Sequence, residues 1–590
     1  MNYLEMPLNL TITIMNLVFD IETDDLKATK IHCLVAQDVE TKEIFKFPPN
    51  KLEEGYAFLE SAEKLIGHNI VGFDIPMVEK FSNVKLSNKT IVDTLVLSRL
   101  FNPVREGGHS LEVWGHRLSL PKIEFEDYQE YSPEMLRYCA RDVQLNTLVF
   151  EQLKKESKGF TKDSVSLEHS TARILKEQEV NGFLFDDRKA ELLLADLRER
   201  MGNIEREVHE VFKPKMIDIK EVTPKLKQDG TLSKQGLTDE EYKERLYTDD
   251  ITPFTRRKLQ DFNLGSRKQI GEYLIEFGWK PKKMTPTGQP MVDEKTLANI
   301  KEIPEARLIA KYLLLQKRIA QIDSWFEAQQ EDDRVHGFVI PNGTITGRMA
   351  HRNPNMAQVP NIKSPFGEEC RSCWTVPEGY KLVGIDASGL ELRILAHYMN
   401  DEEFTNEIIN GDIHAFNQKL AGLKSRDQAK TFIYALIYGA GDRKLGSVVG
   451  GSAKEGTRLR QHFFDNKPTF KALGDKVRRS AQKKYVKGLD GRKIFVRHPH
   501  AALNTLLQGG GAIAMKRALA ILDSLIKLQT LDAKFVANIH DEWQMEVRED
   551  LVDFVGQLAV DCIQTAGNYY NLRCPLDAEY KVGDNWSETH

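Results

Sequence analysis

The sequence predicts a multidomain α/β protein, and three patterns support this class. Short apolar runs alternate with helical patterns over residues 16–150, as expected for a domain in which helices cover a sheet. Over residues 165–211, apolar side chains recur at three- and four-residue steps, which predicts long helices. Strand and helix patterns mix again from about residue 336 onward. A chain of 590 residues is too long for one core, so we expect about three or four structural units.

The segment at about 212–262 interrupts these patterns. It mixes 11 basic and 10 acidic residues with several prolines and glycines, and its apolar residues follow no helical or strand period. This composition predicts a polar insertion or a loosely ordered subdomain.

Several features bear on the location of the protein. No apolar run reaches the roughly 18 residues that a membrane span requires, so we expect no membrane association. The apolar run from Pro7 to Phe19 has no Lys or Arg before it, which favours a strand leading into Asp20 over a signal peptide. Six cysteines in a chain of this length predict a reducing, intracellular setting.

The charge of the chain is distributed unevenly. The net charge is −5, yet residues 419–497 hold 20 Lys and Arg against 6 Asp and Glu. Such a one-signed segment is typical of a surface that binds a polyanion. A solvated helical surface is the alternative.

Three elements near the N-terminus carry candidate metal ligands. Asp20 and Glu22 lie on a predicted strand, where residues i and i+2 point to the same face and can share one metal ion. Asp74 ends the motif HNIVGFD, and Tyr138 precedes Asp142 by four residues, which places both on one side of a helix. The alternative is that Tyr138 packs on a helix face and Asp74 occupies a turn.

A second acidic group lies in the C-terminal half. Asp386 ends an apolar strand, and Asp541 follows another apolar run about 150 residues later. Between them, Arg426, Lys430 and two tyrosines recur every four residues, so they form one stripe of a single helix. Two carboxylates and a basic helix are what nucleotidyl transfer needs, because two Mg²⁺ ions and several cations must hold a triphosphate.

The N-terminal elements together resemble the DEDD-type proofreading 3′–5′ exonucleases in their Tyr-containing variety, which have an RNase H-like fold. The resemblance implies that Asp20, Glu22, Asp74 and Asp142 bind two divalent metal ions. It implies that Tyr138 orients the attacking water.

The C-terminal elements resemble the three motifs of family A DNA polymerases. The segments DASGLELR, RDQAKTFIYALIYGAG, GLDGRK and HPHAALNTLLQ are most similar to replicative polymerases of T-seven-type phages. The resemblance covers about residues 15–590 and implies a right-hand polymerase with palm, fingers and thumb behind the exonuclease domain. It implies DNA-directed DNA synthesis with 3′–5′ proofreading, which replicates phage DNA in the host cell cytoplasm. The expected partners are primer-template DNA, deoxynucleoside triphosphates and a replicative helicase-primase.

The resemblance also implies a role for individual residues. Two Mg²⁺ ions would be bound in the polymerase site by Asp386, Asp541 and the backbone carbonyl of Ala387. The exonuclease site would also bind two Mg²⁺ ions, and Mn²⁺ is a possible substitute at both sites. Lys430 would also protonate the leaving pyrophosphate. The implied nucleotide-binding residues are Arg426, Lys430, Tyr434, Tyr438, Glu391 and His414. The implied DNA-binding residues are Arg348, Gln358, Asn504, Gln508 and His540.

Two of these residues bear on sugar selection. Glu391 occupies the position that closes the space for a ribose 2′-hydroxyl, which implies a deoxynucleotide substrate. Tyr434 carries a hydroxyl that can stand in for the missing 3′-hydroxyl of a dideoxynucleotide, so we expect weak discrimination against chain terminators.

The resemblance implies six segments. They are an N-terminal extension at 1–15, the exonuclease domain at 16–164, the thumb at 165–335, the first palm part at 336–400, the fingers at 401–485 and the second palm part at 486–590. Either Met15 is the native start or residues 1–14 form a short tail, and we expect no 5′-nuclease domain.

T-seven-type enzymes carry a thumb insertion that binds host thioredoxin. The corresponding segment here, at about 212–262, is shorter and almost neutral, whereas a DNA clamp should be basic. Binding of a processivity factor such as thioredoxin at this segment is therefore a hypothesis.

Two other classes of protein remain as alternatives. A single-subunit RNA polymerase shares the palm chemistry but needs neither a proofreading domain nor Glu391 as a sugar gate. A DNA-binding scaffold with inactive sites is disfavoured because every predicted metal-binding side chain is a carboxylate.

Overall fold

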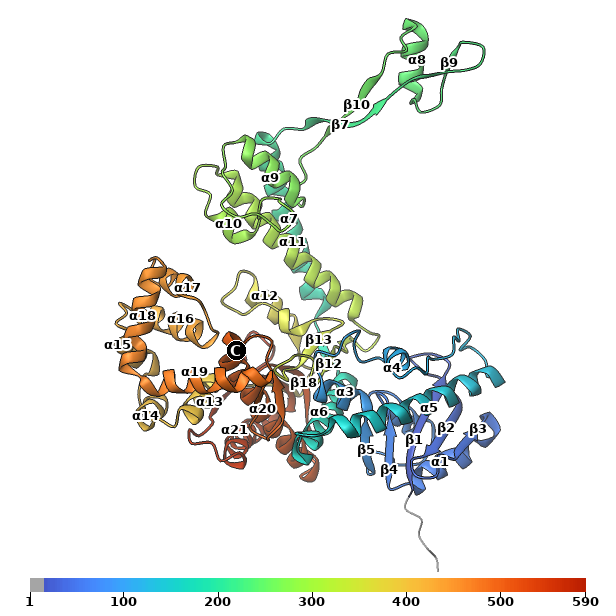
Figure 1. The fold of residues 1–590 in the computed structure, drawn as a ribbon, viewed down its shortest axis with the longest axis vertical. Coiled ribbons are helices and arrows are strands. Elements are labelled where there is room, and N and C mark those ends of the chain that lie inside the picture. The colour runs from blue at the N-terminus through green and yellow to red at the C-terminus, as the bar shows by residue number, and fades with distance from the viewer. Residues whose placement is uncertain (1–14) are drawn as a thin grey trace, which may run out of the picture. The chain divides into compact units, whose positions relative to one another are not determined.

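A computed structural model describes residues 15–590, so the expected N-terminal extension lies, apart from Met15, outside the described residues. The chain divides into two compact units (Figure 1). One comprises the described part of Met1–Asp186 together with Ala328–His590, and the other comprises Asp187–Glu327. Within residues 15–590, no helix is long and apolar enough to cross a membrane.

The N-terminal part of the first unit is built on a five-stranded sheet in the order β3-β2-β1-β4-β5 (Figure 1). Its strands are β1 (Asn16–Thr23), β2 (Ile31–Asp38), β3 (Ile44–Phe47), β4 (Lys64–Gly67) and β5 (Thr90–Asp93). Strands β1, β2 and β3 are antiparallel neighbours, whereas β4 and β5 run parallel to β1. The accompanying helices are α1 (Leu52–Ser61), α2 (Asp74–Phe81), α3 (Thr94–Phe101), α4 (Leu111–Arg117) and α5 (Pro133–Glu156).

The alternation of side chains along β1 decides which face carries its acidic residues. Leu17, Phe19 and Ile21 pack into a core with residues of α1 and α2. Val18 packs on the other face, in a core with residues of α5. Since successive strand residues point to opposite faces, Asp20 and Glu22 lie on the side of the sheet that α5 covers.

The second sheet contains four antiparallel strands in the order β18-β19-β15-β20. They are β15 (Tyr380–Ala387), β18 (Ala533–Ile539), β19 (Glu542–Arg548) and β20 (Ala578–Gly583). Helices α6 (Lys162–Asn181), α20 (Ala502–Leu528) and α21 (Val552–Tyr569) pack around this sheet and bury its apolar residues in one large core. Short strands accompany it at β6 (Phe183–Phe185), β11 (Arg334–Val335), β12 (Phe338–Ile340), β13 (Ala350–Arg352) and β14 (Trp374–Thr375).

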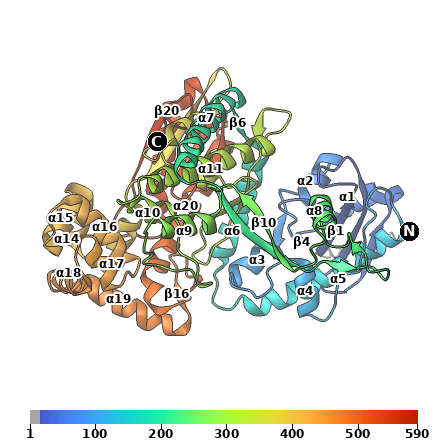
Figure 2. The same ribbon diagram turned by 90° about the horizontal axis from the view of Figure 1, so that it is seen from above.

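A group of helices follows β15 in the chain (Figure 2). It comprises α13 (Leu390–Met399), α14 (Glu402–Asn410), α15 (Ile413–Ala421), α16 (Arg426–Ile437), α17 (Asp442–Ser447), α18 (Ala453–Asn466) and α19 (Pro468–Ser480). Phe432 of α16, Phe463 of α18 and Phe470 of α19 stack edge to face in its core. A hairpin of β16 (Tyr485–Lys487) and β17 (Lys493–Phe495) then leads back to α20.

The second unit, Asp187–Glu327, has its own small core. Its helices are α7 (Asp187–Val211), α9 (Arg267–Glu276), α10 (Glu294–Ala298) and most of α11 (Glu305–Ala328). Phe212, Phe262 and Tyr273 stack with ring centroids 4.5–5.4 Å apart and form the centre of this core.

The polar insertion expected at about 212–262 is an antiparallel ribbon. Strand β7 (Lys215–Val222) pairs with β10 (Phe254–Gln260), and α8 (Asp239–Thr248) and the short pair β8 (Lys225–Leu226) and β9 (Leu232–Ser233) lie between them in the chain (Figure 1). Val222, Leu232 and Leu237 form a small buried cluster in this segment. The insertion is thus polar, as expected, but it has defined secondary structure.

Candidate active sites

The first candidate site lies where β15 ends beside the turn between β18 and β19. Asp386 pairs in register with Glu542, and the backbone N–H of Ala387 donates to the carbonyl of Asp541 at 3.1 Å. The turn contains just His540 and Asp541, and His540 has φ of 59°, as a tight hairpin turn requires. The sheet register therefore places the two predicted metal-binding carboxylates, Asp386 and Asp541, at one edge.

The electrostatics of this edge favour a bound cation. Burial, followed by the negative charges of Asp541 and Glu542, raises the pKa of Asp386 to about 6. A cation bound between such carboxylates removes their mutual repulsion. Carboxylate and carbonyl oxygens are also the ligands that Mg²⁺ prefers, so Asp386, Asp541 and the Ala387 carbonyl suit that ion.

Glu542, next to Asp541, is held by residues that the motif analysis did not identify. Its carboxylate accepts from Trp586 Nε1 at 2.5 Å and from Gln544 Nε2 at 2.8 Å, and it lies 3.3 Å from His590 Nδ1. Burial would raise the pKa of Glu542, but His590, Arg371 and Trp586 outweigh it and lower the pKa. Glu542 therefore stays ionised and fixes the turn that carries Asp541. No sequence pattern links Glu542 to residues near 590.

Helix α16 carries the predicted triphosphate-binding stripe. Ser425 caps it by accepting a hydrogen bond from Gln428 N. Its buried face consists of Ala429, Phe432, Ile433, Leu436 and Ile437. Arg426, Lys430 and Tyr438 are exposed and Tyr434 is half-buried, so the stripe faces away from the helical core.

His414 of α15 lies beside this stripe. Its ring centroid is 6.4 Å from that of Tyr434. Burial, followed by the positive charges of Arg426 and Lys430, lowers the pKa of His414. Arg426 is held by Asp412, whose Oδ2 accepts from Arg426 Nε at 2.7 Å.

Glu391, in the first turn of α13, joins residues from three elements. Its Oε1 accepts from Arg348 at 2.8 Å, and its Oε2 accepts from the Tyr438 hydroxyl at 2.9 Å. Arg348 thus pairs with the predicted sugar gate, a contact that sequence spacing does not predict.

The other predicted DNA contacts lie on separate elements. Arg348 and His540 line one small pocket together with Asp541. Asn504 and Gln508 lie one turn apart on α20, and Gln358 lies in the 3-10 turn Met356–Gln358. The buried Oδ1 of Asn504 has no hydrogen-bond partner in the described structure.

The second candidate site lies between β1 and α5. Asp20 and Glu22 point from the strand toward α5, which carries Tyr138 and Asp142. Asp74, at the start of α2, reaches β1 and accepts from Ile21 N at 3.2 Å. Three segments far apart in the sequence therefore bring the four predicted carboxylates to one place.

Burial raises the pKa of all four carboxylates. Burial raises the pKa of Asp20 and of Glu22 well above the usual value, and the neighbouring carboxylates raise both further. Burial likewise raises the pKa of Asp74 to about 7 and raises the pKa of Asp142. Oδ1 of Asp142 is buried and has no hydrogen-bond partner in the described structure. A crowded group of carboxylates, in which one oxygen lacks a hydrogen-bond partner, is suited to bind divalent cations.

Lys122 is a cation at this site that the motifs did not reveal. Its Nζ lies 2.5 Å from Asp142 Oδ2 and 4.7 Å from the centre of the Tyr138 ring. Phe125 stacks on the same ring with centroids 5.4 Å apart. Lys122 and Phe125 precede α5 in a segment without regular structure, so no periodic pattern could have identified them.

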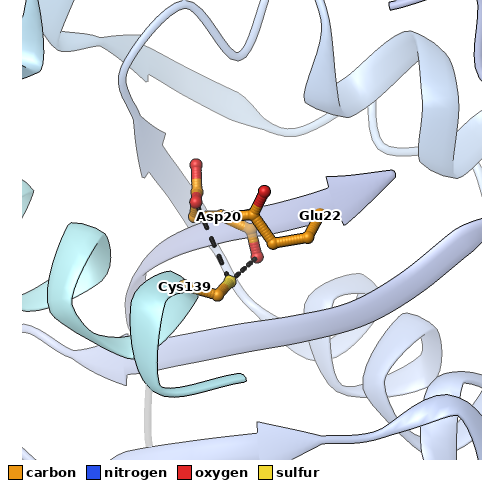
Figure 3. A group of neighbouring side chains, drawn as sticks. All are labelled: Asp20, Glu22 and Cys139. Atoms are coloured by element: carbon orange, nitrogen blue, oxygen red, sulfur yellow. Dashed lines mark hydrogen bonds between the residues drawn. The ribbon is translucent and has the colours of Figure 1, made fainter. Parts of the chain in front are cut away.

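Cys139 adds a sulfur atom to the same group (Figure 3). Its Sγ lies 3.4 Å from the carbonyl of Asp20 and 3.8 Å from Oδ2 of Asp20.

Comparison with known proteins identifies the family. A sequence model described as DNA polymerase family A matches residues 238–588. The chain belongs to DNA polymerase family A. It is 33% identical to the DNA-directed DNA polymerase of Enterobacteria phage T3, over 97% of this chain and 100% of that protein. Identity to the DNA-directed DNA polymerase of Escherichia phage T7 is also 33%, with the same coverage.

A solved structure supports the fold. The polymerase domain of Pol1 from M. smegmatis, in complex with DNA primer-template and dNTP, superposes with a TM-score of 0.78 at 19% identity. It covers 98% of this chain and 96% of that chain. The expected family and fold class are confirmed, and this family A member is a DNA-directed DNA polymerase rather than an RNA polymerase or an inactive scaffold.

Proposed function

We propose that this DNA polymerase adds deoxynucleotides to a primer at the Asp386–Asp541 edge and removes mispaired ones at the Asp20 site. The bond from Ala387 N to the Asp541 carbonyl supports the first part, because it fixes two carboxylate-bearing turns against each other. The convergence of Asp20, Glu22, Asp74 and Asp142 supports the second.

Divalent metal ions are implied at both sites, and we propose Mg²⁺ with Mn²⁺ as a substitute. Asp386, Asp541 and the Ala387 carbonyl would hold them in the polymerase site, and the four N-terminal carboxylates in the exonuclease site. When bound, such ions stabilise the charge that develops on phosphate oxygens and lower the pKa of the attacking hydroxyl or water.

The residues of α16 would hold the incoming triphosphate. Arg426 and Lys430 are exposed cations one turn apart, which suits phosphate oxygens. Lys430 can also give a proton to the leaving pyrophosphate. Tyr434 and Tyr438 continue the stripe, with ring centroids 6.2 Å apart, toward the sugar and the templating base.

The exonuclease site would use Tyr138 as a positioning residue. Lys122 and Phe125 both contact its ring. Burial and a hydrogen bond with Tyr128 raise the pKa of Tyr138, so its phenol stays protonated and can orient a water molecule.

Two substitutions test the two sites separately. Asp386→Ala should lower primer extension by about 10³-fold and spare hydrolysis of single-stranded DNA, while Asp20→Ala should do the reverse. Asp561→Ala is the control for the first, because Asp561 is an exposed carboxylate on α21. Asp24→Ala, just past β1, is the control for the second. Loss of both activities in either active-site variant would contradict two separate sites.

We further propose that the β7–β10 insertion binds a protein processivity factor, with thioredoxin as the first candidate. The insertion exposes large apolar side chains, which mark a protein-binding surface. They include Met216, Ile219, Leu246, Tyr247 and Leu259, with Tyr247 93% exposed. Its nearly balanced charge, 11 basic against 10 acidic residues, argues against direct DNA clamping.

The register of the ribbon indicates where the insertion can be deleted. Lys215 and Gln260 are directly paired, so residues between them can be replaced by a short Gly-rich turn. We expect thioredoxin to increase the nucleotides added per binding event in the intact chain but not in this deletion. An equal response of both proteins, or none in either, would contradict the proposal.

The phage relatives support a cellular setting in which the protein copies phage DNA in the host cytoplasm. A replicative helicase-primase partner is a prediction that rests on the family resemblance. Co-purification of such a partner from infected cells, with and without the ribbon deletion, would test it.

A further inference from the structure

The exonuclease site contains a second possible set of metal ligands. Asp20, Glu22 and Cys139 each offer one donor atom, and these atoms lie within 4.8 Å of one another (Figure 3). Within residues 15–590, this is the one group of three or more acidic, His or Cys side chains that meets this distance. Cys139 is fully buried on α5, between Tyr138 and Asp142 in the chain.

The two ligand sets overlap but differ in chemistry. The set of Asp20, Glu22, Asp74 and Asp142 offers oxygen atoms, which suit Mg²⁺ and Mn²⁺. The set of Asp20, Glu22 and Cys139 offers two oxygens and one sulfur, which suit a thiophilic ion that accepts three or four ligands. Since both sets use Asp20 and Glu22, they cannot be filled independently.

A separate observation indicates that this place is built for a cation. Oδ1 of Asp142 is buried without a hydrogen-bond partner in the described structure, although Asp142 is just 4% exposed. Asp142 follows Cys139 by three residues on α5, about one helical turn, so both side chains lie on the same face of that helix. The other oxygen of Asp142 is engaged by Lys122.

The polymerase site differs in this respect. Within residues 15–590, no group of three acidic, His or Cys donor atoms as close as this one is found at Asp386. A thiophilic ion should therefore distinguish between the two active sites.

We propose that the exonuclease site also binds a thiophilic divalent cation, Cd²⁺, through Asp20, Glu22 and Cys139, in place of the catalytic Mg²⁺. This inference rests on the proposed exonuclease function. On binding, the Cys139 thiol gives its proton to solvent, and a sulfur lone pair forms the bond to the metal. No oxidant or reductant is required. Hydrolysis is blocked because the ion occupies ligands that Mg²⁺ needs.

The direct test is a titration of the full chain with Cd²⁺ in the absence of Mg²⁺. The readout is the ultraviolet charge-transfer absorption of a cadmium–thiolate bond. We expect one tight equivalent in the natural chain and at least tenfold weaker binding, without the band, in Cys139→Ser. Asp20→Asn should also weaken binding at least tenfold. Cys562→Ser, which removes another buried thiol, is the matched control and should keep the band.

Cys139 is buried, so its substitution can disturb folding. Cys139→Ala is the second variant, and thermal melting of both variants reports whether the domain is folded. If both unfold, cadmium NMR of the natural chain and of Cys562→Ser decides, because sulfur-bound and oxygen-bound cadmium resonate in well-separated regions. A resonance typical of oxygen ligands alone would overturn the inference.

Activity assays then separate the two sites. With Mg²⁺ present, added Cd²⁺ should inhibit hydrolysis of single-stranded DNA at concentrations at least tenfold below those that inhibit primer extension. This selectivity should disappear in Cys139→Ser. A band that persists in Cys139→Ser, or equal inhibition of both activities, would overturn the inference.

The proposed function and this inference can fail separately. Absence of Mg²⁺-dependent hydrolysis in the natural chain would overturn the exonuclease function, whatever the Cd²⁺ titration shows. Active hydrolysis without a Cys139-dependent cadmium band would overturn the metal site alone.

Discussion

The hydroxyl of Tyr438 donates to Glu391 Oε2 at 2.9 Å, which ties the end of α16 to the start of α13. Arg348 binds the other carboxylate oxygen at 2.8 Å. Glu391 is therefore held in one position by a neutral donor and by a cation. A side chain fixed in this way can exclude a substituent from the space beside it.

The first prediction concerns sugar selection by Glu391. Glu391→Ala removes side-chain volume and should increase ribonucleotide incorporation relative to deoxynucleotide by about 10- to 200-fold. Glu391→Gln keeps the volume but weakens the pairing with Arg348. It should therefore raise the KM for dNTPs more than it changes the ribonucleotide ratio. Single-nucleotide incorporation kinetics measure both effects. An equal change of the ratio in both variants would show that volume is not the cause.

The second prediction concerns chain terminators and Tyr434. Tyr434→Phe removes the hydroxyl of a half-buried side chain whose ring lies 6.4 Å from that of His414. A lost hydrogen bond of about 1–3 kcal/mol corresponds to a rise of roughly 5- to 150-fold in discrimination against dideoxynucleotides. The ratio of dideoxy to deoxy incorporation measures it, and Tyr485→Phe, in β16, is the control. An unchanged ratio in Tyr434→Phe would contradict the role of the hydroxyl.

The third prediction concerns Lys122. Lys122→Met removes the cation that pairs with Asp142 and leaves crowded buried carboxylates without it. Without Mg²⁺, we expect a loss of about 1–3 kcal/mol in the free energy of unfolding. Mg²⁺ should recover much of this loss, because it binds the folded site. Melting curves with and without Mg²⁺ test this, with the exposed Lys85→Met as control. A variant that melts like the natural chain in both conditions would contradict the expectation.

The fourth prediction concerns acid stability and Glu168. Glu168 is fully buried on α6 and accepts from Lys516 Nζ of α20 at 2.7 Å and from Arg492. Burial alone would raise the pKa of Glu168, but Lys516 and Arg492 outweigh it and lower the pKa. A carboxyl whose folded pKa is lowered stabilises the fold above its unfolded pKa. This stabilisation is lost as the pH falls below about 4 toward the folded pKa.

Glu168→Gln should therefore cost about 3–5 kcal/mol at neutral pH and reduce the loss of stability in acid. Urea unfolding at pH 7 and at a pH below 4 measures both effects. Glu177→Gln is the control, because the Glu177–Lys527 pair is nearly half exposed and should contribute about 0–1 kcal/mol. Equal losses of unfolding free energy in the two variants would show that burial of Glu168 and its partners is unimportant.

Much of each candidate site could be predicted because its residues repeat at local spacings. Asp20 and Glu22 share a strand face, and Arg426, Lys430, Tyr434 and Tyr438 share a helix face, whatever the rest of the chain does. The insertion was harder to predict, because the ribbon of β7 and β10 pairs residues that are up to 45 positions apart.

The sequence by itself determined the α/β class, the family resemblance and the identity of the carboxylates, since these depend on residue type and on short spacings. The tertiary structure decided which side chains join them. Lys122 and Cys139 reach the Asp20 site, Arg348 reaches Glu391, and His590 reaches Glu542. These contacts depend on sheet register and on the packing of segments far apart in the chain. Such packing is set by the whole core, and no local periodicity records it.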